Sequence, residues 1–235
     1  MRYLKRLVSV YIIMVFCIFA VSGCAGTVNY EGKELVDRAK QLHTELEAAH
    51  ITVTDEISGI VVQEITYRFV GDVMQYMYIG RDAETGEEYY EFNNGTELDT
   101  WHTGDTAWSF AAKGSDSYYG YSRASRHYFA DGAWLLDEHI SAISSAEMGN
   151  FNANKWVRLK YDDAKISGYE TMTGVVGYEQ SYTFEENDTG YCYALVVRFT
   201  RDGREYRYVT MIGYYDKDKP VERIEPPTLS DKTEN

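Results

Sequence analysis

The sequence predicts an α+β fold, with a mainly antiparallel sheet and two helices. One apolar stripe at helical spacing lies near the N-terminus. Most of the remaining chain consists of short runs with the two-residue alternation of strands, separated by Gly, Asn and Asp turns. The Asp202-Gly203 pair between two such runs predicts a two-residue hairpin loop. The sequence has no internal repeat of fixed period. Its length of 235 residues is consistent with one domain.

The first 24 residues combine a basic flank with an apolar core. Three basic side chains precede an apolar segment over residues 7–21, which is typical of a secretory signal and short for a membrane span. Val21-Ser22-Gly23-Cys24 follows directly. Small residues allow an extended backbone to enter a peptidase cleft, and the cysteine sulfur is a nucleophile that can take up a lipid.

This arrangement resembles the lipobox of bacterial lipoproteins. The resemblance implies that residues 1–23 are a signal peptide, cleaved after Gly23, and that Cys24 carries lipid chains such as palmitate. Residues 24–31 then form a short tether. Two or more acyl chains, at about 0.8 kcal/mol for each buried methylene, make a stable anchor. We therefore expect an extracytoplasmic protein held on the bacterial cell membrane; the alternative is an uncleaved membrane helix that ends by chance in a cysteine.

Charge and cysteine content exclude several classes of protein. The chain has 37 acidic and 23 basic side chains and a net charge of −14, which argues against binding nucleic acid or an anionic lipid surface. If Cys17 leaves with the signal and Cys24 is lipidated, Cys192 is the one remaining thiol. Its apolar neighbours favour a buried small residue over a reactive nucleophile.

Residues 32–50 are predicted to form an amphipathic helix. Apolar residues recur at spacings of four, three, four and three: Leu35, Ala39, Leu42, Leu46 and Ala49. Charged residues occupy the other sides, so the helix must bury one stripe against the rest of the fold.

Strands are expected to follow this helix. Those of the first half are residues 60–70, 73–79 and 87–92, and a run that carries Trp101. Residues 114–126 are rich in Ser, Tyr and Gly and are predicted to be a loop. Leu136, Ile140 and Ile143 stand at helical spacing and predict a second helix over residues 133–148, with Gly149 as its stop signal.

The second half is predicted to return to strands. They are expected at residues 156–161, 170–172, 175–184, 191–200, 204–215 and 221–225, followed by a polar tail over residues 228–235. The Asp202-Gly203 loop fixes the register of one hairpin, in which Phe199 faces Tyr206 and Val197 faces Tyr208. The same register pairs Leu195 with Thr210, Tyr193 with Ile212, Cys192 with Gly213 and Tyr191 with Tyr214.

The order of these elements resembles the LolA/LppX-like superfamily, with a lipobox, one amphipathic helix, a long antiparallel meander, a helical insertion and a short strand before two prolines. The resemblance implies a strongly curved sheet, or half-open β-barrel, over residues 32–227. The N-terminal helix and the inserted helix would cover its concave face. Many members carry lipids or lipoproteins between membranes, and related domains sense the state of the envelope.

One face of the predicted hairpin is nearly all aromatic and aliphatic. Its members are Tyr193, Leu195, Val197, Phe199, Tyr206, Tyr208 and Ile212. We expect this face to look into the concave cavity and to contact a ligand or the covering helices, with tyrosine hydroxyls that orient a bound amphiphile. The opposite face, with Cys192, Ala194 and Gly213, suits close packing.

No motif for catalysis, a cofactor or a metal ion is present. The chain lacks His-Glu-x-x-His, Gly-x-Ser-x-Gly, a phosphate loop and a dinucleotide fingerprint, and His102 near Asp105 favours a polar turn over a general base. We therefore expect a non-enzymatic lipoprotein that binds or carries an apolar or amphiphilic ligand. The 22 Tyr and 4 Trp leave open a surface module for carbohydrate or protein, with an envelope sensor that regulates a membrane partner as a further alternative.

Overall fold

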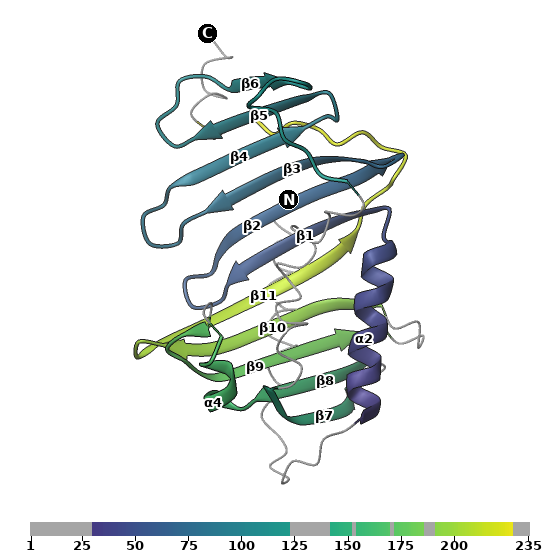
Figure 1. Ribbon diagram of the computed structural model, residues 1–235, viewed down its shortest axis with the longest axis vertical. Helices are drawn as coiled ribbons and strands as arrows, with labels where there is room; N and C mark the ends of the chain where they lie inside the picture. The colour runs from purple at the N-terminus through teal and green to yellow at the C-terminus, as the bar shows by residue number, and fades with distance from the viewer. Residues whose placement is uncertain (1–29, 123–141, 152–153, 170–171, 186–190, 228–235) are drawn as a thin grey trace.

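The computed structural model describes residues 30–122, 142–151, 154–169, 172–185 and 191–227 (Figure 1). In this part of the chain, one 11-stranded sheet has the order β6-β5-β4-β3-β2-β1-β11-β10-β9-β8-β7. All neighbouring strands are antiparallel. The described sheet is strongly curved and does not close, and a helix crosses one face. The predicted fold class is therefore confirmed.

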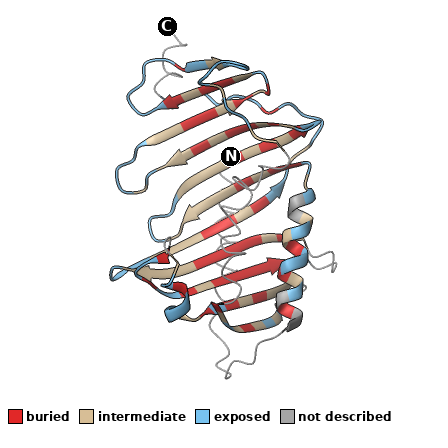
Figure 2. Ribbon diagram, in the orientation of Figure 1, coloured by how far each residue is buried: buried red, intermediate tan, exposed pale blue. Residues whose placement is uncertain are grey.

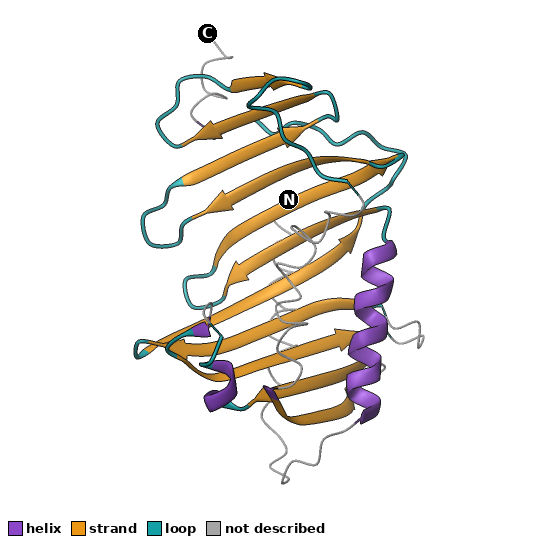
Figure 3. Cartoon of the chain, viewed as in Figure 1, coloured by secondary structure: helices purple, strands orange, loops and turns teal. Residues whose placement is uncertain are grey.

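Most of the described elements are strands; helix α2 precedes them and the short helix α4 lies between β8 and β9 (Figure 3). Their bounds are α2 Tyr30–Glu45, β1 Ala48–Asp55, β2 Ile60–Val70, β3 Val73–Arg81, β4 Glu88–Asn93, β5 Glu97–His102, β6 Ser109–Ala112, β7 Ile143–Phe151, β8 Asn154–Tyr161, α4 Asp163–Ile166, β9 Val175–Phe184, β10 Cys192–Arg201 and β11 Arg204–Tyr214. Strands β1 to β6 form one meander and β7 to β11 a second. Pairing of β1 with β11 joins the two meanders into one sheet.

The first helix ends earlier than predicted. It stops at Glu45, and Ala48, Ala49 and His50 already belong to β1, which the sequence analysis missed. The run from Ala48 to Asp55 alternates with period two and is rich in β-branched residues. Ala49 fits both the helical and the strand period, so the helical pattern was extended too far.

Helix α2 packs on the sheet face formed by β7 and β8, which we call the helix face. A Cβ atom on Gly32 would lie 3.2 Å from Val157 Cγ1, so the helix approaches β8 closely. Val36 and Ala39 are buried, with 2 % and 0 % exposure, whereas Leu42 of the predicted stripe is only half-buried. Figure 2 shows both buried and exposed positions along α2. The buried stripe is therefore rotated from the predicted one toward Val36.

The second predicted helix is wrong where the structure describes it. Residues 133–141 lie outside the described part, but Ile143 begins strand β7. Gly149, the predicted stop signal, pairs with Trp156 inside that strand. A Cβ there would lie 2.6 Å from the Trp156 ring, so the glycine makes room for the indole. Pairing with β8 outweighs the helical spacing of the apolar residues.

Two short predicted strands are also wrong. Residues 170–171 lie outside the described part, and Met172 belongs to a helical turn. Before it stands the unpredicted helix α4, capped by Asp162, whose carboxylate accepts from the Ala164 and Lys165 N–H groups. Residues 221–225 form no strand and pack instead by their side chains.

This C-terminal segment covers the sheet face opposite α2. It closes an apolar cluster of Met77, Ile79, Tyr90, Trp101, Trp108 and Val221. Arg223 pairs with Asp99 at 2.9 Å and lies 5.2 Å from the Trp108 ring centroid, while the Trp108 indole donates to Glu225 at 2.8 Å. Both tryptophans are thus core side chains in this fold.

The hairpin prediction is confirmed over most of its length. Asp202 and Gly203 have φ angles of 52° and 79°, as a two-residue loop with two left-handed positions requires. The observed pairs run from Arg201–Arg204 to Ala194–Met211. Among the described residues 191–214, the predicted pairs beyond Ala194 are not part of this ladder, because the pairing of β10 with β9 shifts between Cys192 and Ala194.

Candidate functional site

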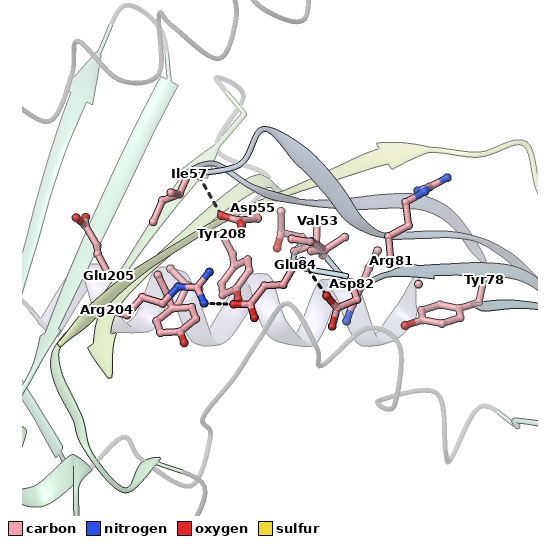
Figure 4. Close-up of a pocket in the computed structure, with 17 residues that line it drawn as sticks. Val53, Asp55, Ile57, Tyr78, Arg81, Asp82, Glu84, Arg204, Glu205 and Tyr208 are labelled. Atoms are coloured by element: carbon pink, nitrogen blue, oxygen red, sulfur yellow. Dashed lines mark hydrogen bonds and ion pairs between the residues drawn. The ribbon is translucent and has the colours of Figure 1, made fainter. Parts of the chain in front are cut away.

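A pocket of about 470 Å³ lies beside the β1–β2, β3–β4 and β10–β11 hairpin turns, at the ends of the central strands of the sheet (Figure 4). Strands β1, β2, β3, β10 and β11 supply its walls. The aliphatic lining is Val53, Val62 and Val197, and the aromatic lining is Tyr78, Tyr206 and Tyr208. Charged residues gather at the turns, including Asp55, Asp82, Glu84, Arg204 and Glu205. This combination of apolar walls and a charged opening is typical of small-molecule sites.

The inner wall of the pocket is a row of side chains whose positions follow from the strand register. Val53 of β1 pairs with Gln63 of β2 on one side and with Thr210 of β11 on the other, so the three side chains stand in one row across the sheet. The pairing of β1 with β2 shifts after Val53, and this bulge lets Val62 as well as Gln63 line the pocket.

Stacked aromatic rings connect the pocket to the core. Phe199 lies 4.9 Å from Tyr206 between ring centroids and 6.0 Å from Tyr178, with both pairs stacked. Tyr206 in turn stacks on Tyr208 at 6.4 Å. Because these rings alternate on adjacent strands, the hairpin register fixes their positions relative to one another.

The charged side chains at the opening hold the turns together. Glu84, in the turn after β3, forms an ion pair with Arg204 at the start of β11. Asp82 accepts from the Glu84 and Thr85 N–H groups at 2.8 Å, and Asp55 accepts from Ile57 N–H at 3.0 Å. Burial, with a smaller effect of the Asp55 charge, raises the pKa of Tyr208, so its hydroxyl stays protonated and can donate.

Two clusters of buried polar side chains occupy the same sheet face outside the pocket. At the first, Tyr76, Tyr89 and Tyr119 all donate to the carboxylate of Glu91, Tyr119 at 2.6 Å. Burial, then the nearby carboxylate, raises the pKa of Tyr76 and of Tyr89 well above the usual value. These tyrosines are therefore neutral donors.

At the second cluster, Gln180 is 1 % exposed and serves three tyrosines. Tyr161 and Tyr182 donate to its Oε1 at 2.8 and 2.7 Å, and its Nε2 donates to the Tyr178 hydroxyl at 3.1 Å. Both clusters satisfy their own hydrogen bonds, as buried polar groups must. They support the fold and leave the pocket as the candidate site.

The seven side chains predicted to face a cavity divide into two groups. Val197, Tyr206 and Tyr208 line the pocket. The other four lie elsewhere: Leu195 and Ile212 are buried in the core, Phe199 packs against it, and the Tyr193 hydroxyl accepts from Asn154. The sequence analysis missed the lining from β1, because it did not predict that strand.

The remaining sequence-based candidates have simple structural roles or lie outside the described residues, as Cys24 and the rest of residues 1–29 do. Cys192 is fully buried, and burial raises the pKa of its thiol to about 12, in keeping with a packed small residue. Asp105 accepts from the backbone N–H of His102 at 2.8 Å, which is a turn contact.

The described part of the chain offers neither a metal site nor a membrane-spanning helix. No group of three or more His, Cys, Asp or Glu side chains there is placed to hold a metal ion. Neither described helix combines the length and apolar character needed to cross a membrane.

Comparison with known proteins finds neither a matching family model nor a curated protein that matches. Among solved structures, the chain is similar to LprF from Mycobacterium bovis, with 12 % identity and a TM-score of 0.48 over 84 % of this chain and 100 % of LprF. It is also similar to the Mycobacterium tuberculosis lipoprotein LppX, with 8 % identity and a TM-score of 0.47 over 81 % of this chain and 99 % of LppX. Similarity at this level assigns neither a ligand nor an activity.

Proposed function

We propose that this protein is a lipid-anchored, non-enzymatic, extracytoplasmic lipoprotein that binds an apolar or amphiphilic ligand in the pocket. The observation that carries this proposal is the pocket itself, with its aliphatic and aromatic walls next to a charged opening. A ligand with an apolar chain would bury that chain against Val53, Val62 and the tyrosine rings. Its polar end would stay close to hydrogen-bonding groups.

The aromatic surface that favoured a carbohydrate-binding module is less available than the composition suggested. Trp101 and Trp108 are 2 % and 8 % exposed and lie in the cluster under the C-terminal segment. A buried indole cannot stack on a sugar. The role of an envelope sensor stays a prediction from the sequence.

The anchoring proposal divides the chain into a signal peptide over residues 1–23, a lipidated tether over residues 24–31, one domain over residues 32–227 and a tail over residues 228–235. Cys24 is the proposed site of lipid attachment. Cys24→Ser should abolish incorporation of labelled palmitate and leave the precursor uncleaved or release the protein from the membrane, because serine lacks the nucleophilic sulfur. Cys192→Ser is the matched control and should label normally. Label retained in Cys24→Ser would contradict the assignment.

Ligand binding is tested directly by calorimetric titration. The full-length protein, purified from membranes and exchanged into amphipol, is titrated with monodecanoylglycerol, a single-chain amphiphile. One molecule should bind per chain with a negative heat-capacity change, because apolar surface is buried. Empty amphipol is the control for partitioning. Absence of saturable binding by monodecanoylglycerol, decanoate and decylamine alike would refute the proposal.

A further inference from the structure

We propose that the pocket selects a single-chain amphiphile with an uncharged, hydroxyl-bearing headgroup, and that Gln63, Tyr208 and Thr210 form its hydrogen-bonding subsite. This inference rests on the proposed function and names the chemistry of its ligand. Three features of the pocket support it: polar side chains without partners, cationic side chains that are already paired, and a size suited to one chain.

The first feature is a set of neutral polar groups that lack partners. Within the described residues, the side chains of Gln63 and Thr210 and the hydroxyl of Tyr208 form no hydrogen bond, although all three line the pocket. Thr210 is 3 % exposed as a residue, and its unpaired hydroxyl oxygen keeps accessible surface in the pocket lining. A ligand that reaches this hydroxyl can supply the hydrogen-bond partner that the described residues do not.

Elsewhere on the same sheet face, buried polar side chains do have partners. Gln180 bonds three tyrosine hydroxyls, and Glu91 accepts from three others. The buried polar side chains of these two clusters, which support the fold, are therefore hydrogen-bonded to one another. The unpaired set occurs where the surface is hollowed, and this coincidence indicates a site for a ligand.

The second feature is that both cationic side chains in the described lining of the pocket are already paired. Arg204 is paired with Glu84, and the carboxylates of Asp55 and Asp82 accept backbone N–H groups of their own turns. An anionic headgroup would meet these carboxylates, and Arg81, the other cation of the described lining, is already paired with Glu88 at 2.8 Å. A cationic headgroup at the inner wall would lose its hydration and would find there only the neutral side chains of Gln63, Tyr208 and Thr210, which do not offset that cost. An uncharged headgroup avoids both costs.

The third feature is the arrangement of the subsite. Gln63 and Thr210 flank Val53 on adjacent strands, and Tyr208 lies two residues before Thr210 on the same strand and face. Together they offer an amide that both donates and accepts and two hydroxyls. A volume of about 470 Å³ lies in the range for a ligand of moderate size and suits one acyl chain with a small headgroup.

The test compares three ligands with the same ten-carbon chain: monodecanoylglycerol, decanoate and decylamine, each titrated calorimetrically into the full-length protein in amphipol. We expect monodecanoylglycerol to bind at least about tenfold more tightly than either charged ligand. Thr210→Val keeps the β-branched shape and removes the hydroxyl, so it should weaken monodecanoylglycerol about tenfold. Its effect on the two charged ligands should be much smaller.

Thr52→Val is the matched control, because Thr52 is next to Val53 on β1 and points to the opposite face. It should leave all three affinities unchanged, and melting curves confirm that each variant folds. Equal binding of the three ligands, or tighter binding of decanoate or decylamine, would overturn the headgroup assignment while the proposed function stands. An unchanged affinity in folded Thr210→Val would likewise overturn it. Failure of all three ligands to bind would overturn both.

Discussion

Replacing Val36 by Asp is expected to lower the free energy of unfolding by about 3–5 kcal/mol. Val36 is 2 % exposed and belongs to the core cluster on the helix face. The substitution removes the burial of an aliphatic side chain, which contributes about 1.5–3 kcal/mol. It also places a carboxyl group in a cluster of buried apolar side chains. Equilibrium unfolding in urea measures the change.

The control for this experiment is Arg38→Asp, which introduces the same residue on the exposed side of α2. Its effect should stay within about 0.5 kcal/mol. If Val36→Asp and Arg38→Asp unfold at the same urea concentration as the wild type, α2 contributes little to the domain. The conclusion that packing of α2 on β7 and β8 stabilises the domain would then be wrong.

Most of the strands could be predicted because their signals are local. Strand β2 agrees with the predicted residues 60–70, and β9 with 175–184. The Asp202-Gly203 loop determined a register that the structure follows for eight residue pairs, because a two-residue loop with positive φ angles leaves no freedom to slip. The residue types in the turns and the two-residue alternation are enough to predict such strands from the sequence.

The errors arise where apolar residues fit two periods at once. Ala49 continues the helical spacing of α2 but lies in β1, and Ile143 continues the spacing of Leu136 and Ile140 but begins β7. In both cases the decision comes from pairing with a distant strand: β1 pairs with β11, and β7 with β8. Such pairing is a property of the whole fold and outweighs local propensity.

Part of the pocket lining could be inferred from the predicted hairpin register. The predicted hairpin face supplied Val197, Tyr206 and Tyr208. The facing wall comes from β1, and its contribution could not be foreseen without that strand. Gln63 lies in a predicted strand, in unbroken register with Ile65, so alternation alone places it on the pocket face; Val62 lines the pocket only because of the bulge between β1 and β2. No signal in the sequence marks that bulge.

Filling the pocket should abolish ligand binding. Val53 lies at the centre of the lining on β1 and is half-buried, so Val53→Trp places an indole in the space that a ligand needs. We expect the affinity for monodecanoylglycerol to fall by at least about 100-fold, since the chain loses its apolar contacts and the inner hydrogen-bonding wall. Thr52→Trp, with the same new residue on the opposite face of β1, is the control and should bind as the wild type does.

The most direct measurement is native mass spectrometry of the full-length protein, purified gently from membranes, for wild type, Val53→Trp and Thr52→Trp. The account predicts a bound amphiphile, one per chain, on the wild type and on Thr52→Trp, and its absence from Val53→Trp. The same bound mass on all three proteins would place the ligand outside the pocket, and a wild type that neither carries a ligand nor takes up added monodecanoylglycerol would contradict the central claim.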